Sequence, residues 1–396
     1  MYVYADNAAT TAVSEAAFHA MVPCMQELYA NPSSLHSRGQ AVKEVLDNAR
    51  ATFAKYLNAA DVREIEFTSG GSEADNQALR SAAVIGARKG KRHIVSTKFE
   101  HHAMLHTLKA LEKEGFEVTL LDIPADGVIT VEQVRDAIRE DTCLVSVMFA
   151  NNEIGTIQPI AEIGALCHEK GVLFHTDAVQ AAGHLHIDVQ AMNIDMLSLS
   201  AHKFHGPKGV GVLYARRNIP LTNLIYGGAQ ERGRRAGTEN MPGICGAAAA
   251  FQEACETMDE TNVRLTHMRD RLIEGLSKVP HSLLNGDPVR RLPGNVHFCF
   301  EGIEGESMLL LLDAKGVAAS SGSACASGDL DPSHVLLALG RPHEVAHGSL
   351  RLSLCGWNTE EEVDHILEVV PAVVDYLRAY SPVWDELETG KRPHLI

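Results

Sequence analysis

The stretch Met196–Ala215, MLSLSAHKFHGPKGVGVLYA, decides the fold class of this chain. It opens and closes with short apolar runs typical of buried strands, Met196–Ser200 and Gly211–Ala215. The loop between them is centred on Gly206-Pro207 and is short for a crossover. The second strand is therefore predicted to run antiparallel to the first, at or near an edge of a sheet.

Upstream of this stretch, from about residue 65, short β-rich runs alternate with longer helical patterns. The other predicted strands are His93–Thr97, Val118–Ile123, Cys143–Phe149 and Val172–Thr176. The predicted helices between them are Ser72–Arg88, His102–Glu114, Val131–Ile138 and Ile160–Lys170. This alternation predicts an α/β fold with a mostly parallel sheet and helices on both faces.

Downstream, a long helical pattern at 244–277 is followed by a second, smaller α/β pattern. Its predicted elements are the strands Asn295–Phe300, Val317–Ala319 and Ser349–Leu354 and the helices Glu306–Lys315, Ser333–Leu339 and Glu360–Ala379. We predict a large domain over 1–250, a connecting helix over 251–277 and a small C-terminal domain over 278–396. The N-terminal segment is expected to pack with one of the two domains.

Composition argues against several classes of function. Lys and Arg total 35 against 51 Asp and Glu, so the formal net charge is −16. A surface this acidic repels phosphate backbones and anionic lipid, so no nucleic-acid or membrane role is expected. No apolar run approaches the roughly 20 residues of a bilayer-spanning helix, and Met1–Asp6 has no features of a secretory signal. We expect a cytoplasmic protein.

The eight cysteines stand singly, without a CxxC pair, as reduced thiols do in cytosolic enzymes. Cys143 and Cys299 lie in apolar runs and are expected in the core. Cys325 differs, because it lies in the small, polar run SSGSACASGD at 320–329. A thiolate on a loop of this kind can enter a site and attack sulfur, whereas the alternative is a buried cysteine in a tight loop.

Polar side chains follow the predicted strands, where ligands bind in open α/β sheets. They are Glu100, His101 and His102, then Asn151, Asn152 and Glu153, then Asp177 and Gln180, then His202 and Lys203, with Ser69-Gly70-Gly71-Ser72 before the first long helix. One lysine, one acid, a histidine and a glycine-rich helix start therefore meet at one rim. This is the set that pyridoxal phosphate requires.

Each of these residues suits one part of that cofactor. Lys203 offers an amine for a Schiff base, and Asp177 a carboxylate for the pyridine nitrogen. Gly71 and Ser72 offer donors at a helix N-terminus for the phosphate, and His101 a flat group against the ring.

Each of these residues, taken alone, also has a simpler structural interpretation. Gly71 and Ser72 can form only a tight turn and a helix cap, and Asp177 can be an ordinary cap or turn residue. The helical spacing of His102 and His106 is compatible with zinc, but a third convergent ligand is missing. Lys208 follows the Gly-Pro turn and is expected in solvent.

Arg351 belongs to the alternating run SLRLSL at 349–354, which turns it away from the leucines. Its guanidinium can bind an α-carboxylate through two parallel hydrogen bonds, and a structural ion pair is the alternative.

The chain resembles the cysteine desulfurases of the NifS/IscS type, in the class V, fold-type I group of pyridoxal phosphate enzymes. The resemblance covers nearly the whole length. Its motifs are YADNAATT at 4–11, NPSSLH at 31–36, TSGGSEADN at 68–76, EH at 100–101, NNEIG at 151–155, HTDAVQ at 175–180, SAHK at 200–203, GPKG at 206–209, RAGTEN at 235–240, SSGSAC at 320–325 and SLR at 349–351. Ser72 departs from the family's frequent threonine, and Ala326 from its frequent threonine or serine.

The resemblance also implies roles for individual residues. Lys203 would bind the cofactor covalently, and His101 would stack on its ring and assist proton transfer. Cys325 would receive the sulfur. The cofactor would be held by Gly71, Ser72, Asn152, Asp177, Gln180, Ser200, His202 and Lys203, and by Thr238 reaching across from the partner subunit of a homodimer. The substrate carboxylate would be received by Asn31, Asn152 and Arg351.

The expected reaction converts L-cysteine to L-alanine and leaves a persulfide on Cys325, which would pass sulfur to an iron–sulfur scaffold protein. No permanent metal site is expected, although Cys325 could contact metal during cluster transfer. The alternatives are a selenocysteine lyase or a class V aminotransferase on the same scaffold. Two further alternatives are a sulfur-relay platform that does not need Lys203 and a metal-binding protein that uses the histidines.

Overall fold

The computed structural model describes residues 1–322 and 332–396. Its largest sheet consists of β2 (Ile65–Thr68), β3 (His93–Thr97), β4 (Glu117–Leu121), β5 (Thr142–Ser146), β6 (Leu173–Asp177), β7 (Met196–Ser200) and β8 (Gly211–Ala215). The strand order is β2-β8-β7-β6-β5-β3-β4. The strands from β4 to β7 are mutually parallel, while β8 is antiparallel to both β7 and β2. The predicted α/β class and the antiparallel strand near an edge are therefore confirmed.

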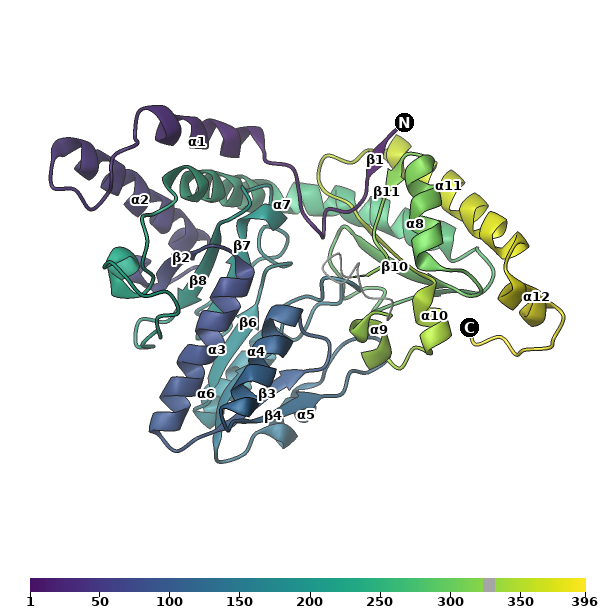
Figure 1. Ribbon diagram of the computed structural model, residues 1–396, viewed down its shortest axis with the longest axis horizontal. Helices are drawn as coiled ribbons and strands as arrows, with labels where there is room; N and C mark the ends of the chain where they lie inside the picture. Colours follow the sequence, from purple (N-terminus) through teal and green to yellow (C-terminus); the bar gives the residue numbers. More distant parts are fainter. Residues whose placement is uncertain (323–331) are drawn as a thin grey trace.

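Helices cover both faces of this sheet (Figure 1). One face is packed by α3 (Gly71–Arg88) and α4 (His102–Lys113), whose apolar side chains meet Ile94, Leu144 and Leu213. The other face meets α2 (Ser37–Tyr56), α6 (Ile160–Lys170) and the first half of α7 (Met241–Leu276). Because both faces are covered, every residue of β3, β5, β7 and β8 is buried.

A second, smaller lobe contains a three-stranded antiparallel sheet in the order β12-β10-β9. Its elements are β9 (Ser282–Leu284), β10 (Asn295–Phe300), α8 (Gly305–Ala314), β11 (Val317–Ala318), α9 (His334–Ala338), α10 (His343–His347), β12 (Ser349–Ser353), α11 (Glu360–Ala379) and α12 (Pro382–Glu388). The local sequence explains α11 well. Thr359 and Glu362 form a capping box at its start, and Val363, Ile366, Val370 and Val374 form its buried stripe.

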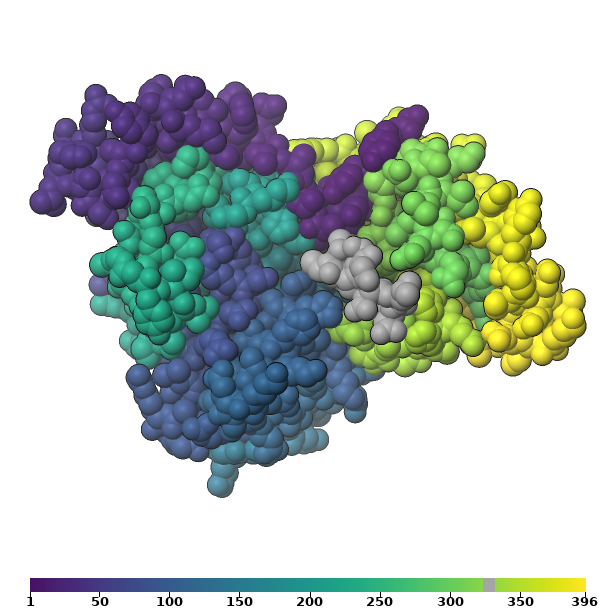
Figure 2. Space-filling view, in the orientation of Figure 1, coloured from purple at the N-terminus to yellow at the C-terminus, as the bar shows by residue number. Residues whose placement is uncertain are grey.

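The continuous helix α7 joins the two lobes, because it packs on α1 (Glu15–Gln26) and α2 at one end and on α11 further along. The N-terminal segment also spans both lobes, and Figure 2 shows it in purple along one side of the molecule. Its β1 (Val3–Tyr4) pairs in parallel with β11 of the small lobe. The expected packing with a single domain is therefore too simple, and the exact domain boundaries stay a prediction. The remaining helix, α5 (Val131–Ala137), follows β4.

Within the described ranges, none of the helices has the combination of length and apolar composition that membrane crossing requires.

Candidate active site

A cavity lies where the parallel strands end and the two lobes meet. It is lined by Ala8, Ala9, Gly71, Ser72, Asp75, His101, Met148, Asn152, Asp177, Val179, Gln180, Ser200, His202, Lys203 and Arg351. Ten of these residues were predicted from the sequence as site residues, and they come from the residues that follow strands of the large sheet, from the start of α3 and from β12. The structure thus brings together the predicted lysine, acid, histidine and helix start.

Lys203 ends the short 3-10 helix η2 (Ala201–Lys203), which follows β7 directly. Its Nζ donates to the carbonyl oxygens of Ala8 and Ala9 at 2.6 and 2.7 Å. The N-terminal segment therefore fixes the position of the amine in the wall of the cavity. Sequence reasoning missed this contribution, because backbone carbonyls leave no signature in side-chain patterns.

Asp177 is the last residue of β6, and its Oδ1 accepts a hydrogen bond from Val179 N at 2.9 Å. Burial raises the pKa of Asp177 to about 6, against the opposing effects of the Val179 N–H and the Lys203 charge. A cationic group placed beside Asp177 would offset this desolvation. A protonated ring nitrogen is such a group.

His101 is the N-cap residue of α4, and its Nδ1 accepts from Ala103 N at 3.1 Å. Burial, and next the positive charge of Lys203, lower the pKa of His101 to about 4. The ring is therefore neutral near pH 7 and carries its proton on Nε2, because Nδ1 is the acceptor.

The start of α3 forms a cradle for an anion. Gly70 precedes the helix without a side-chain cap, so the first N–H groups of α3 have no such partner. A Cβ on Gly71 would lie 2.7 Å from Val179 Cγ2, so only glycine fits there. Ser72, Ser200 and His202 line the same part of the cavity. Backbone donors, hydroxyls and the helix dipole favour a phosphate at this point.

Arg351 lies on β12 of the small lobe, lines the same cavity and is 1% exposed. Its Nη1 donates to Asn152 O at 2.9 Å, and its Nη2 lies 3.1 Å from Asp6 Oδ1. Nε has no hydrogen-bond partner among the described residues. Arg351 therefore forms a structural ion pair and also lines the cavity, while its predicted role in binding a carboxylate stays a prediction.

Two predicted site residues do not line this cavity. Asn31 lies on an exposed loop, where its Oδ1 accepts from Ser33 N. Thr238 lines a separate hollow with Glu231 and Arg235, so its predicted role in a partner's site stays a prediction. Cys325 lies outside the described residues.

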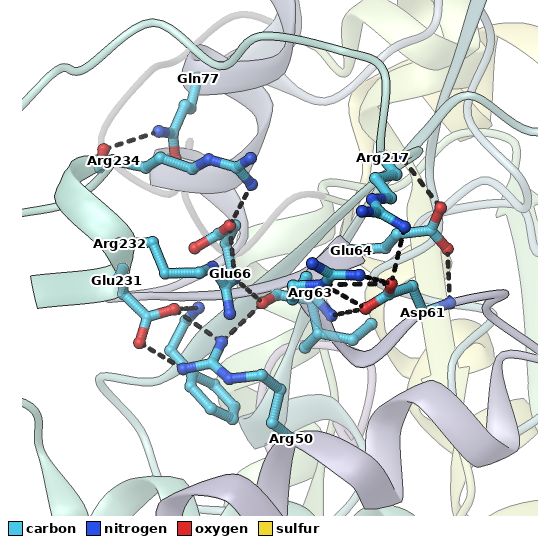
Figure 3. Close-up of polar contacts among 12 residues, drawn as sticks. Arg50, Asp61, Arg63, Glu64, Glu66, Gln77, Arg217, Glu231, Arg232 and Arg234 are labelled. Carbon is cyan, nitrogen blue, oxygen red and sulfur yellow. Dashed lines mark hydrogen bonds and ion pairs between the residues drawn. The ribbon is translucent and has the colours of Figure 1, made fainter.

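The segment before Thr238 is tied to the large lobe by a network of ion pairs (Figure 3). Glu231, on the 3-10 helix η3 (Gln230–Gly233), forms a buried ion pair with Arg50 of α2. Glu66 of β2 contacts Arg232 and Arg234. Burial, and next the charge of Glu231, raise the pKa of Glu66 to about 7 despite these two arginines.

Among the described residues, two groups hold side chains that converge as metal ligands do: Asp75, His101 and Asp177 in the cavity, and His281, Glu301 and His394. Neither includes His102 with His106. In the second group Glu301 accepts from His394 Nδ1 at 2.8 Å and from Leu395 N at 2.6 Å. Its carboxylate therefore already has partners that hold the C-terminal segment.

The prediction that Cys143 and Cys299 lie in the core is confirmed. Cys143 and Cys299 are 5% and 0% exposed and lie in the core. Burial raises the pKa of each thiol to about 11, which makes both unreactive near neutral pH.

Sequence reasoning also missed Asp75, although its position three residues after Ser72 on a helix places it on the same face. Glu100 was noticed in the sequence but received no role. It is fully buried, its Oε1 accepts from Thr97 Oγ1 at 2.7 Å, and burial raises its pKa to about 8.

An open α/β sheet with a lysine, a buried acid and an anion cradle at its strand ends defines a fold-type I enzyme site. Comparison with known proteins agrees. The family model for class-V aminotransferases matches residues 3–366. A cysteine desulfurase IscS from Clostridium botulinum is 54% identical over 392 residues, which is 98% of each chain.

Solved structures show the same relationship. A NifS-like protein is 38% identical and superposes with a TM-score of 0.89, over 95% of this chain and 100% of that one. SspA, solved in complex with cysteine, is 35% identical with a TM-score of 0.78, over 90% and 99% of the two chains. The chain belongs to the class-V aminotransferase family of pyridoxal phosphate enzymes, within its group of NifS/IscS-type cysteine desulfurases.

Proposed function

We propose that this chain removes sulfur from L-cysteine, forms L-alanine and receives the sulfur on Cys325. The observation that carries the proposal is one cavity that joins Lys203, Asp177 and His101 to an anion cradle, in a chain 54% identical to a named cysteine desulfurase. A relative solved with cysteine supports the choice of substrate.

The residues present fit pyridoxal phosphate. The Cβ-intolerant Gly71 and the side-chain-uncapped start of α3 suit its phosphate, with Ser72, Ser200 and His202 beside them. Asp177 would face the ring nitrogen, His101 the ring, and Gln180 the ring hydroxyl. Lys203 would supply the amine that binds the cofactor. When bound, pyridoxal phosphate withdraws electrons from the α-carbon of an amino acid.

The chain's own residues would then act on the substrate. Arg351, with Asn152 beside it, receives the α-carboxylate and so fixes the orientation of the amino acid. Lys203 moves the proton at the α-carbon, because its amine lines the cavity that would receive the substrate. The neutral His101 holds a proton at Nε2 and can donate it to the carbon from which the sulfur is removed.

Cys325 would act as the nucleophile. Its thiolate attacks the substrate Sγ, the substrate Cβ–Sγ bond breaks, and a persulfide remains on Cys325 while the carbon chain takes up a proton and leaves as alanine. The sulfur would pass from this persulfide to an acceptor, for which an iron–sulfur scaffold protein is our candidate.

Thr238 would reach the cofactor phosphate of a second subunit. Large apolar side chains on and beside α1, namely Phe18, Met25 and Tyr29, are more than half exposed, which suits an interface between copies. Light scattering should give twice the mass of the chain, and Thr238→Ala should weaken cofactor binding without changing that mass. A monomer that binds the cofactor normally would refute this part of the proposal.

The Lys203 assignment is tested by borohydride reduction of the purified protein, followed by peptide mapping. We expect a yellow protein whose label falls on Lys203. Lys208→Ala is the matched control, because Lys208 is exposed and its Nζ donates to Thr11 O. If Lys203→Ala kept its colour and a reducible adduct, the assignment would be wrong.

The Cys325 assignment is tested by measuring alanine and sulfide from Cys325→Ala. We expect loss of persulfide formation, while Cys255→Ala, a half-buried thiol on α7, should behave as the wild type. Persulfide formed at the wild-type rate by Cys325→Ala would exclude this nucleophile. Amino transfer to a keto acid without Cys325 would instead identify an aminotransferase.

A further inference from the structure

Two aspartates, not one, lie at the floor of the cavity. Asp75 on α3 and Asp177 on β6 both line it, and each is nearly inaccessible to solvent, at 1% and 5% exposed. One carboxylate oxygen of each and one ring nitrogen of His101 lie within 4.8 Å of one another. Asp75 has no role in the function proposed above.

A chain of hydrogen bonds supports Asp75 from below. Ser146 Oγ lies 2.8 Å from His175 Nδ1, His175 Nε2 lies 3.0 Å from Ser198 Oγ, and Ser198 hydrogen-bonds the Asp75 carboxyl. If Ser198 donates to Asp75, it accepts from His175 Nε2, and His175 Nδ1 accepts from Ser146. This one arrangement satisfies every group in the chain.

The other oxygen of Asp75 is different. Asp75 Oδ1 is buried and has no hydrogen-bond partner among the described residues, and the nearest ring nitrogen below it, His175 Nε2, is 3.8 Å away. A buried carboxylate oxygen without a partner is costly. A proton on Oδ1 removes the charge and turns this oxygen into a hydrogen-bond donor.

The charges around Asp75 also favour a neutral acid. Burial, and next the negative charge of Asp177, raise the pKa of Asp75 well above its usual value. Glu100 adds a third carboxyl, and Lys203 is the cation that faces this group from the cavity. Like charges this close in a buried site do not both ionise.

We propose that Asp75 is a positioning residue that stays protonated and donates a hydrogen bond to Asp177, so that one negative charge, not two, faces the cofactor ring nitrogen. The inference rests on the proposed function, because it concerns how Asp177 holds that nitrogen. A neutral donor at position 75 fixes the orientation of the Asp177 carboxylate and leaves its charge intact. An ionised Asp75 would act instead as a second carboxylate toward the cofactor.

Two substitutions distinguish these roles. Asp75→Asn keeps the size and offers an amide donor but can never ionise, whereas Asp75→Ala removes the donor. Asp195→Asn is the matched control, because Asp195 is a mostly buried acid that contacts Phe174 N and Arg216 and does not line the cavity. Each variant is prepared as holoenzyme, then stripped and reloaded with pyridoxal phosphate to measure its dissociation constant.

We expect Asp75→Asn and Asp195→Asn to bind pyridoxal phosphate within about 3-fold of the wild type. Asp75→Ala should bind roughly 10-fold or more weakly, the size of one lost hydrogen bond to a charged group. With cofactor labelled at the ring nitrogen, the nitrogen NMR signal of Asp75→Asn should match the wild type, and that of Asp75→Ala should shift. A purely structural role would not move this signal.

The outcomes are separable. If Asp75→Asn binds as weakly as an Asp75→Ala protein, or shifts the nitrogen signal, Asp75 acts as an ionised second carboxylate and the inference is wrong. Unchanged affinity and signal in Asp75→Ala would also overturn it. If circular dichroism shows that Asp75→Ala does not fold, the comparison of Asp75→Asn with the wild type still tests the inference. A wild-type protein that forms no adduct at Lys203 would instead refute the proposed function, and this inference with it.

Discussion

Replacing Glu231 with glutamine tests whether a buried ion pair holds the segment that carries Thr238. Glu231 Oε1 and Oε2 accept from Arg50 Nη2 and Nη1 at 2.7 and 2.8 Å, and Oε2 also accepts from Phe67 N at 2.9 Å (Figure 3). The two charged side chains are only 3% and 6% exposed. Water therefore cannot replace either partner.

The expected loss of stability follows from this geometry. Glutamine keeps the size and can still accept from Phe67 N, but it places an amide NH2 against one Arg50 nitrogen and leaves the guanidinium charge unpaired. Breaking a buried pair from one side costs about 3–5 kcal/mol. Glu231 and Arg232 also have positive φ angles, 45° and 56°, so part of this energy opposes local backbone strain.

The assay is urea unfolding of the holoenzyme followed by circular dichroism, combined with the cofactor dissociation constant. Asp47→Asn is the control, because the Lys43–Asp47 pair is 51% and 56% exposed and should contribute about 0.5 kcal/mol or less. Cofactor affinity should fall in Glu231→Gln and not in Asp47→Asn. If the two variants lost the same small amount of stability, the pair would not hold the segment and the reasoning would fail.

Three further predictions concern the core and the cavity. Burial lowers the pKa of His175 from 6.5 to about 3, so its contribution to the free energy of unfolding is complete above pH 6.5 and falls by about 1.4 kcal/mol per pH unit toward pH 3. Urea unfolding at several pH values should show a slope shallower by that amount in His175→Gln, and equal slopes would contradict this. Gly211→Ala should clearly lower the melting temperature, because its Cβ would lie 2.4 Å from the Gly70 backbone. Gly70→Ala is the control and should have little effect, because the nearest atom to its Cβ would be 3.9 Å away. Equal shifts in melting temperature would contradict the packing argument. Arg351→Lys should raise KM for L-cysteine roughly 10-fold or more while cofactor affinity stays unchanged, because an ammonium cannot bind a carboxylate through a fork, and an unchanged KM would remove Arg351 from the substrate site.

Much of the fold follows from local sequence patterns. The predicted bounds of β3, β7, β8 and β10 agree with the structure residue for residue, because buried parallel strands and short hairpin-like loops leave compact apolar runs. β2 was missed, since Ile65–Thr68 contains a glutamate, and its place beside β8 depends on pairing far along the chain. Predicted strand ends were too long where an apolar run continues into a buried loop, as at Val147–Phe149.

The candidate site was predictable to the extent that it follows strand ends. Asp177 ends β6, and Lys203 and His101 follow the ends of β7 and β3 within four residues, so their convergence could be inferred from topology. The carbonyls of Ala8 and Ala9 could not, because they reach Lys203 only when the N-terminal segment crosses between the lobes. Asn31 shows that a motif match alone does not place a residue, because its loop does not line the cavity of the same chain.

The protonation states of the acids in the site depend on their folded surroundings and cannot be inferred from residue type. Asp75, Glu100 and Asp177 look alike in the sequence, yet burial raises the pKa of Asp177 to about 6 and that of Glu100 to about 8, and that of Asp75 well above its usual value. Asp177 therefore ionises first as pH rises past 6, near Lys203, whose charge favours it. A site that needs one carboxylate beside a cationic ring nitrogen can obtain it from three acids only if their surroundings differ, and here the Lys203 charge favours the ionised form of Asp177, whose charge in turn opposes ionisation of Asp75.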